Sequence, residues 1–308
     1  MIKVFPQSNT TQFTNRLINC NPLTYLSNNG YKLGKLNKID FANGELSVEL
    51  NESVRNKTIV IVAQPINYNQ IFELLSTIDA ARRSSAKEII AVIPNLPHSR
   101  QERRANGIRT SISARLFADM LQTAGLDRII TMDVHTTAIE GFYKIPFDNI
   151  GPFNIFIEEI KKLNLKYPVF VSPDFGAMKT IKNYAKNLGY NMAFINKERL
   201  RPNEVNDMTL IGNVDDQDVI MIDDLIDTGG TILKASDLLI EEGANSINIF
   251  ATHGIFSNNA VELFNKNNNI DNIFVTNTIP SIENIFNFKI NVIDVSCQFH
   301  NALDKILN

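Results

Sequence analysis

Residues 219–231, with the sequence VIMIDDLIDTGGT, combine the residue types that a phosphorylated sugar needs. Four apolar residues predict a buried strand, the acids Asp223 and Asp224 follow it, and a Thr-Gly-Gly-Thr turn leads into a predicted helix. Glycines without Cβ atoms let a phosphate approach the backbone N–H groups of a helix N-terminus. Carboxylates repel a phosphate, so the two acids indicate a ligand that also carries hydroxyl groups or a divalent cation. The structural alternative is a strand followed by an acidic turn and a capped helix.

Two further polar positions, His135 and Asp174, follow predicted strands. His135 stands after an acid and before two threonines, which favours a polar cleft over a buried structural histidine. Asp174 ends the segment VSPD, where a carboxylate can be a helix N-cap or a metal ligand. If phosphate oxygens and water supply most of the ligands of a Mg²⁺ ion, an imidazole and a carboxylate can complete its coordination shell.

Positive charge is concentrated in two segments. Residues 195–203, INKERLRPN, contain Lys197 and Arg199 and are either a solvated loop or a mobile arm that closes over a transferring phosphoryl group. Residues 94–109 contain Arg100, then Gln101, and three more arginines. We expect this cluster to anchor a polyphosphate nucleotide rather than nucleic acid, because arginine binds phosphate bidentately and the whole chain carries a net charge of −3.

The composition is ordinary for a globular protein, and the length of 308 residues predicts about two domains. The balance of 30 basic and 33 acidic residues predicts neither a nucleic-acid partner nor a membrane partner. No secretory h-region and no membrane-spanning apolar run is recognisable, so a cytoplasmic location is expected. Cys20 and Cys297 are the only cysteines, and we expect neither a disulfide framework nor a cysteine-rich zinc site.

Strand-like runs alternate with helical runs along the chain, which predicts an α/β fold with largely parallel sheets flanked by helices. A turn signal at residues 150–152 divides the chain into two similar halves, residues 1–150 and 151–308. Asn43-Gly44 predicts a hairpin.

Open parallel sheets bind ligands beyond the carboxyl ends of their strands, which is where His135, Asp174 and Asp223 are expected. The predicted strands are residues 58–63, 89–93, 128–133, 169–172, 192–195, 219–222, 247–251, 273–276 and 289–295, and the predicted helices are residues 71–83, 111–124, 153–163, 179–188, 232–242 and 298–307.

Taken together, the segments resemble ribose-phosphate pyrophosphokinase, a family also called phosphoribosyl pyrophosphate synthetase. The likeness extends from Phe41 to the C-terminal helix and follows the order of the family's motifs. Residues 219–231 by themselves are similar to the ribose-phosphate-binding loop that type I phosphoribosyltransferases share with this family. The other segments that carry the likeness are FANGE with NESVR, LLSTIDAARRSSA, VIPNLPHSRQER, ISARLFADMLQTAGLDRIITMDVHTTAIEGF, VSPD and INKERLRPNEV.

The resemblance implies two type I phosphoribosyltransferase-like domains in a homo-oligomer built from dimers, such as a hexamer. The N-terminal domain would supply nucleotide binding and subunit contacts, and the C-terminal domain the ribose 5-phosphate loop. Mg²⁺ would be the cofactor, held by His135 and Asp174. Lys197 and Arg199 would be the catalytic pair. The resemblance implies that ATP is bound by Phe41, Asn43, Gly44, Glu45, Arg100 and Gln101. It implies that ribose 5-phosphate is bound by Arg199, Asp223, Asp224, Asp227, Thr228, Gly229, Gly230 and Thr231.

The sequence departs from the family pattern at several positions. Asn43 stands where an Asp is usual, and Glu198 lies between the two catalytic cations where an Arg is usual. The turn after Asp174 is Phe-Gly-Ala instead of a glycine-rich one. Ala138 and residues 257–259 replace residues of the family's phosphate and ADP regulatory site. Catalysis is therefore expected to be retained, and regulation by phosphate and ADP stays open.

The reaction implied by the resemblance transfers the pyrophosphoryl group of Mg-ATP to the anomeric hydroxyl of ribose 5-phosphate and releases AMP. A type I phosphoribosyltransferase is one alternative, although such a protein would not need the N-terminal half. A non-catalytic, synthetase-associated regulatory subunit is another. The intact Lys197, Arg199, His135 and Asp174 favour the enzyme.

Overall fold

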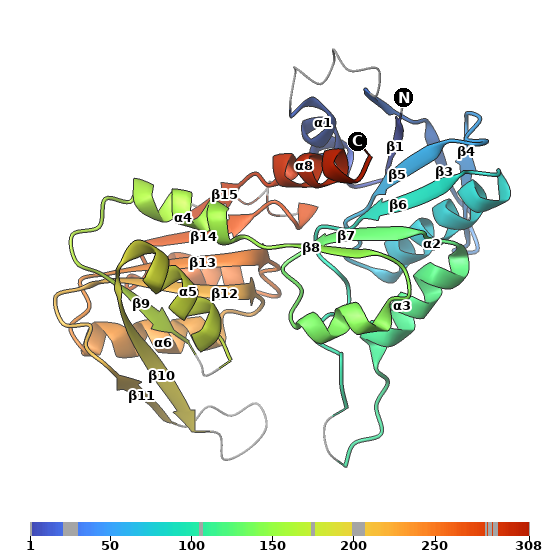
Figure 1. The fold of residues 1–308 in the computed structure, drawn as a ribbon. Helices are drawn as coiled ribbons and strands as arrows, with labels where there is room; N and C mark the ends of the chain where they lie inside the picture. The colour runs from blue at the N-terminus through green and yellow to red at the C-terminus, as the bar shows by residue number, and fades with distance from the viewer. Residues whose placement is uncertain are drawn as a thin grey trace. The chain divides into compact units, whose positions relative to one another are not determined.

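The computed structural model describes residues 2–20, 30–104, 107–173, 176–198, 207–280, 282, 285 and 289–307. Two compact units make up the chain (Figure 1). Unit 1 is Met1–Ile150, Thr278–Pro280 and Asp294–Asn308, and unit 2 is Gly151–Asn277 and Ser281–Ile293. The chain therefore passes from one unit to the other at Ile150, near the turn signal, and returns its last residues to unit 1.

Unit 1 is built on a six-stranded sheet with the order β2-β1-β5-β6-β7-β8, in which every pairing is parallel. The central strands are short runs of β-branched residues because a parallel sheet that is covered on both faces buries all of them. Helices α2 (Tyr68–Arg83) and α3 (Ser113–Ala124) contribute Leu74, Ile78 and Leu121 to its core. The strands are β1 (Ile2–Pro6), β2 (Tyr31–Leu33), β5 (Thr58–Val62), β6 (Glu88–Val92), β7 (Arg128–Met132) and β8 (Phe147–Ile150).

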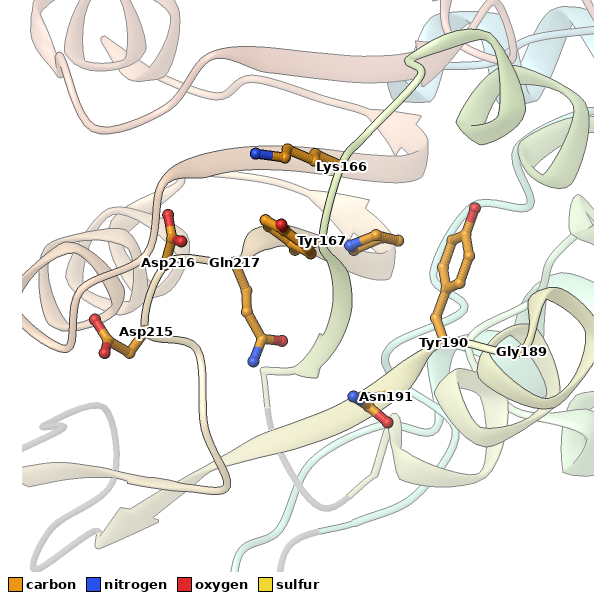
Figure 2. A pocket seen from close by; sticks show the side chains of 9 residues that line it. Lys166, Tyr167, Gly189, Tyr190, Asn191, Asp215, Asp216 and Gln217 are labelled. Atoms are coloured by element: carbon orange, nitrogen blue, oxygen red, sulfur yellow. The ribbon is translucent and has the colours of Figure 1, made fainter.

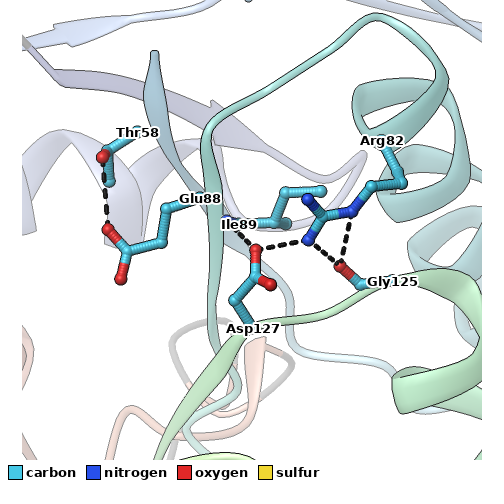
Figure 3. Close-up of polar contacts among 6 residues, drawn as sticks. All are labelled: Thr58, Arg82, Glu88, Ile89, Gly125 and Asp127. Atoms are coloured by element: carbon cyan, nitrogen blue, oxygen red, sulfur yellow. Dashed lines mark hydrogen bonds and ion pairs between the residues drawn. The ribbon is translucent and has the colours of Figure 1, made fainter. Parts of the chain in front are cut away.

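One polar cluster joins the end of α2 to the sheet (Figure 3). The Arg82 guanidinium donates from Nη2 to the Gly125 carbonyl at 2.7 Å and forms an ion pair with Asp127. The same carboxylate accepts from the backbone N–H of Ile89 at 2.8 Å. Gly125 ends α3 in the left-handed conformation, with φ of 108°, and a Cβ there would lie 3.0 Å from Arg82 Nε. A single arginine therefore connects α2, α3 and the start of β6.

The N-terminal helix α1 (Thr11–Asn19) and the C-terminal helix α8 (Ser296–Leu307) pack together in unit 1. Phe13 and Phe299 meet edge to face with ring centroids 5.7 Å apart. Cys20 and Cys297 form a disulfide, so the expectation that the two cysteines make none is wrong, because α1 and α8 bring the two ends of the sequence together. These contacts explain why residues Asp294–Asn308 belong to unit 1, whereas the sequence assigned all of residues 151–308 to the second half.

The expected hairpin consists of β3 (Leu36–Asp40) and β4 (Leu46–Leu50), paired antiparallel with Asp40 opposite Leu46. Gly44 donates its N–H to the Phe41 carbonyl at 2.9 Å, and Phe41 donates to the Glu45 carbonyl at 2.8 Å. These two bonds close the turn that Asn43-Gly44 predicted.

Unit 2 carries a seven-stranded sheet with the order β11-β10-β9-β12-β13-β14-β15, parallel except for the β10–β11 pair. Its core contains Val171, Met221, Leu239 and Ile249. The strands are β9 (Pro168–Ser172), β10 (Asn191–Glu198), β11 (Asp207–Ile211), β12 (Asp218–Ile226), β13 (Ser246–Gly254), β14 (Asn272–Thr276) and β15 (Ile290–Ile293), and the helices are α4 (Phe153–Lys162), α5 (Met178–Leu188), α6 (Gly230–Glu241) and α7 (Ala260–Lys266).

The prediction of an α/β fold with largely parallel sheets flanked by helices is confirmed. The sequence missed β1, α1, β2, β8, β11 and α7, which are short or lie at the edges of their units. No helix in the described part of the chain is long and apolar enough to cross a membrane.

We predict that Asp127→Ala lowers the free energy of unfolding by about 1–3 kcal/mol, because it removes an ion pair and leaves the Ile89 N–H without its acceptor. Urea denaturation followed by circular dichroism measures the change. Asp79→Ala is the matched control, because its ion pair with Arg83 is an exposed i,i+4 pair that contributes little. An equal loss in both variants would contradict the role of this cluster.

Candidate functional site

The segment around Asp223 lies at the carboxyl end of β12, in the middle of the unit 2 sheet. Strand β12 runs to Ile226, beyond the predicted end at residue 222, because it keeps pairing with β13 as far as Gly254. Its pairing with β9 stops at Met221. The two acids therefore lie on a strand extension that is hydrogen-bonded on one side, and they are half-buried. Asp223 Oδ1 accepts the Asp224 N–H at 2.9 Å.

The turn after β12 rests on two phenylalanines. Gly229 has φ of 77°, and a Cβ there would lie 2.6 Å from the Phe264 ring. Phe264 meets Phe256 edge to face at 5.9 Å. The carbonyl of Asp227 accepts from the Ser257 N–H at 3.1 Å, which ties the turn to the segment after β13. The backbone of the turn is therefore held against a fixed apolar support.

The other face of this turn is open at the N-terminus of α6. Thr228, Gly230 and Thr231 are exposed, and a Cβ on Gly230 would meet nothing within 4 Å. Gly229 occupies the N-cap position without a side chain to cap the helix, and the first turn carries no acid. The N–H groups and the dipole of α6 therefore face an approachable space, which is the arrangement that binds an anion.

The neighbouring strand β9 ends at Ser172, beside β12 in the sheet. Pro173 is buried and follows it directly. The parallel pairing of β9 with β12 brings the segment that leads to Asp174 to the same sheet edge as Asp223. Asp174 itself lies outside the described residues.

Lys197 belongs to a strand, which corrects the prediction of an irregular loop. Strand β10 runs from Asn191 to Glu198 and pairs antiparallel with β11, with Lys197 opposite Met208. The sequence showed no recognisable strand pattern for this partner, because β11 is a short strand at the sheet edge. Arg199 and Arg201 lie outside the described residues.

His135 lies at the carboxyl edge of the unit 1 sheet, three residues after β7. It is exposed, and the following Thr136 caps a short 3₁₀ helix, Thr137–Phe142, by accepting from the Ala138 N–H at 3.4 Å. Asp133 adopts φ of 46°, a rare backbone state for a non-glycine residue and one that is concentrated at functional sites.

The arginine-rich segment follows β6, the neighbour of β7. The Met132 N–H donates to the Pro94 carbonyl at 3.2 Å, so this segment leaves the same sheet edge as His135. Arg100 and Gln101 are exposed. The Gln101 carbonyl accepts from the Ala114 N–H at 3.3 Å, which connects the segment to α3.

His98 is a residue that the sequence analysis missed. Its backbone has φ of 62°, and its ring stacks on Tyr68 and meets Phe117 edge to face, both with centroids 6.3 Å apart. The rings fix the backbone two residues before Arg100. A histidine within a Pro/Ser/Arg-rich segment carries no pattern that would reveal such packing.

The hairpin residues Phe41, Asn43 and Glu45 are exposed at the turn between β3 and β4. The Asn43 side chain accepts from the Glu45 N–H at 3.1 Å, so its oxygen shapes the turn. Phe41 keeps 49% of its surface exposed and Ile39 keeps 40%, so the hairpin presents two apolar side chains at its surface.

A hollow of about 460 Å³ in unit 2 lies at the opposite sheet edge (Figure 2). Pro168, Asn191 and Gln217, at or beside the amino ends of β9, β10 and β12, contribute to its lining. Beside it, burial disfavours a charged Asp218, but hydrogen bonds from Ser246, Tyr167 and Lys166 outweigh that effect and hold the pKa of this carboxyl below its ordinary value. Because Asp223 and Gly229 follow the carboxyl end of β12, this hollow is separate from the candidate site.

Within the described ranges, no group of three or more His, Cys, Asp or Glu side chains could hold a metal ion by itself. An exposed imidazole such as His135 nevertheless suits a cation whose other ligands are phosphate oxygens and water. The described donors therefore fit a metal that arrives with a nucleotide better than a metal bound by protein alone.

The fold and the glycine turn define an α/β protein with an open, anion-accessible helix N-terminus at the carboxyl edge of a largely parallel sheet. The N-terminal domain of ribose phosphate pyrophosphokinase matches residues 2–125, and the phosphoribosyl synthetase-associated domain matches residues 194–308. The ribose-phosphate pyrophosphokinase of Vibrio cholerae is 40% identical over 281 residues, covering 90% of this chain and 89% of that protein. Ribose-phosphate pyrophosphokinase 3 of Saccharomyces cerevisiae is 40% identical over 270 residues, covering 86% and 84%.

Similarity to a solved structure agrees with these relatives. Phosphoribosylpyrophosphate synthetase from Mycobacterium smegmatis superposes with a TM-score of 0.89 at 33% identity and covers 99% of this chain and 98% of that one. The chain belongs to the ribose-phosphate pyrophosphokinase family. The family predicted from the motifs is thus confirmed, and with it the prediction of two phosphoribosyltransferase-like domains.

We predict that Gly229→Ala and Gly230→Ala differ strongly in their effect on stability. The first places a Cβ at positive φ and against Phe264, so the free energy of unfolding should fall by about 1–3 kcal/mol. The second meets open space, and its free energy of unfolding should stay within roughly 1 kcal/mol of the parent value. Urea denaturation of both variants measures this, and equal losses would show that Phe264 does not support the turn.

Proposed function

We propose that this protein transfers the pyrophosphoryl group of Mg-ATP to the anomeric hydroxyl of ribose 5-phosphate, forming phosphoribosyl pyrophosphate and AMP. The observation that carries the proposal is the Gly229–Gly230 turn, open to an anion on one face and supported by Phe264 on the other, in a chain of this family. A phosphate accepts hydrogen bonds from the helix N–H groups, while nearby carboxylates accept them from ribose hydroxyls.

In this proposal, Thr228, Gly229, Gly230 and Thr231 bind the 5-phosphate. Asp223, Asp224 and Asp227 face the ribose side, where acceptors are needed. The half-burial of Asp223 and Asp224 supports the role, because partial exclusion of water strengthens their hydrogen bonds to a ligand.

The nucleotide is assigned to unit 1, through Arg100 and Gln101 and through the hairpin residues Phe41, Asn43, Gly44 and Glu45. The exposed position of Arg100 beside the β7 edge supports contact with phosphates. The uncovered Phe41 and Ile39 support a hairpin that reaches a second subunit, and hence a homo-oligomer built from dimers. Unit 1 would thus supply nucleotide and subunit contacts, and unit 2 the sugar phosphate.

His135 and Asp174 would hold Mg²⁺ together with the triphosphate. When bound, the ion would neutralise phosphate oxygens and orient the chain of phosphates. Lys197 and Arg199 would stabilise negative charge that develops on the transferring group while the anomeric oxygen attacks the β-phosphorus and the AMP oxygen departs. Positioning and charge stabilisation therefore carry the catalysis, as is usual in phosphoryl transfer.

A cytoplasmic location, predicted from the sequence, fits an enzyme of soluble nucleotides and remains a prediction. A non-catalytic regulatory subunit is the alternative that Glu198 and the changed turn after Asp174 suggest. Activity of the isolated protein distinguishes the two.

We predict that the purified protein with Mg-ATP and ribose 5-phosphate releases AMP in a one-to-one ratio with phosphoribosyl pyrophosphate, measured by ion-exchange chromatography. ADP as the nucleotide product would indicate an ordinary kinase and contradict the proposal.

Lys197→Ala should lower kcat about 100-fold or more while ATP binding persists, because the charge of Lys197 acts mainly in the transition state. No turnover in the parent protein would favour the regulatory subunit.

We predict that Asp223→Asn raises the KM for ribose 5-phosphate about tenfold or more and leaves the KM for ATP within about twofold. The asparagine keeps the Oδ1 acceptor for the Asp224 N–H, so the loop itself should hold its shape. Asp216→Asn, at the opposite edge of unit 2, is the matched control and should change neither constant. A parallel rise in the KM for ATP would contradict the assignment of Asp223 to the sugar.

A further inference from the structure

The two cysteines lie together although 277 positions separate them in sequence. Cys20 follows the last residue of α1, and Cys297 lies in the first turn of α8. Their Cα atoms are 5.3 Å apart, inside the range that a disulfide requires. Neither residue belongs to the site described above.

The packing of α1 against α8 holds these positions without help from the disulfide. Leu17, Phe299 and His300 are fully buried at this contact. The Leu17 carbonyl lies 2.8 Å from His300 Nδ1, and Asp304 on the next turn of α8 accepts a 2.6 Å hydrogen bond from the Tyr31 hydroxyl. Reduced thiols would therefore stay close to each other, and the bond could form and break within the folded chain.

Both cysteines are half-buried, so the pair lies near the surface, where a small reagent can approach it. Cys297 is the second residue of α8, where the helix dipole favours a thiolate, the reactive form in exchange. The packed helices supply proximity, and the surface position supplies access.

We propose that Cys20 and Cys297 form a thiol–disulfide exchange site that accepts a small-molecule disulfide such as oxidised glutathione and thereby locks α8 to α1. The Cys297 thiolate attacks one sulfur of the reagent, forms a mixed disulfide and releases one thiolate. The Cys20 thiolate then attacks Cys297 Sγ and releases the second. Two protein thiols are oxidised to one disulfide, the reagent is reduced to two thiols, and the two cysteine protons pass to these products. A glutathione-type thiol reverses the sequence.

The disulfide joins the N-terminal and C-terminal helices. Cys297 lies three residues after Asp294, where the chain returns to unit 1, so the bond fixes the returning segment to the N-terminal helix. A bond across so long a loop restricts the unfolded chain strongly. In a reducing compartment this bond would be transient, and an oxidising one would make it permanent.

The test equilibrates the full chain with set ratios of reduced to oxidised glutathione, quenches with acid and labels free thiols with a polyethylene-glycol maleimide. We expect both thiols to disappear together in a single-chain product, reversibly, and the melting temperature to rise by roughly 3–10 °C on oxidation. The double variant Cys20→Ser/Cys297→Ser should show no redox-dependent shift. Thiols that stay labelled at every ratio, bonds that join two copies, or an unchanged melting temperature would overturn the proposal.

Phe13→Ala keeps both cysteines and weakens the α1–α8 contact, because Phe299 loses its ring partner. Its oxidation midpoint should move about tenfold toward oxidised glutathione, because looser helices lower the effective concentration of one thiol at the other. The exposed control Gln12→Ala, on the same helix, should keep the parent midpoint. An unmoved midpoint in Phe13→Ala would show that pairing does not depend on the folded contact and would overturn the proposal.

Discussion

The contact of Gly229 with the ring of Phe264 is the constraint on which the functional interpretation depends. A side chain at position 229 would have to displace that ring, so only glycine lets the turn lie on its apolar support. With the backbone held there, the start of α6 has no side-chain cap, and Gly230 and Thr231 are exposed. A phosphate site needs this combination of a fixed backbone and an open approach, because amides that must first rearrange lose affinity.

The backbone of the two acids before the turn is also held in place, in this case by strand pairing. Strand β12 extends past Asp223 and Asp224 through its pairing with β13. Leu225 opposite His253 and Ile226 opposite Gly254 continue that ladder to the start of the turn. The backbone that carries the two acids is thus held by main-chain hydrogen bonds.

The sequence predicted the buried strands and the long helices well because their signals are local. Strands such as β5 and β6 are uninterrupted runs of β-branched residues, and Gly125 and Gly189 mark two helix ends. The pairing of Lys197 with Met208 depends on a short edge strand, the ring stack on His98 depends on Tyr68, and the disulfide depends on the packing of α1 against α8. Such long-range partners leave no periodicity in the sequence, so they could not be predicted from it.

The candidate site was predicted from sequence motifs, which do not say which motifs lie next to each other. The fold supplies that information. Parallel order brings the ends of β6 and β7 together in unit 1 and those of β9 and β12 together in unit 2. Motifs that are far apart in sequence therefore share a sheet edge within each unit, as strand-end chemistry requires. The hollow beside Asp218 lies at the amino ends of the strands, and none of the predicted site motifs lines it. In this fold the direction of the strands, more than the size of a cavity, identifies where chemistry takes place.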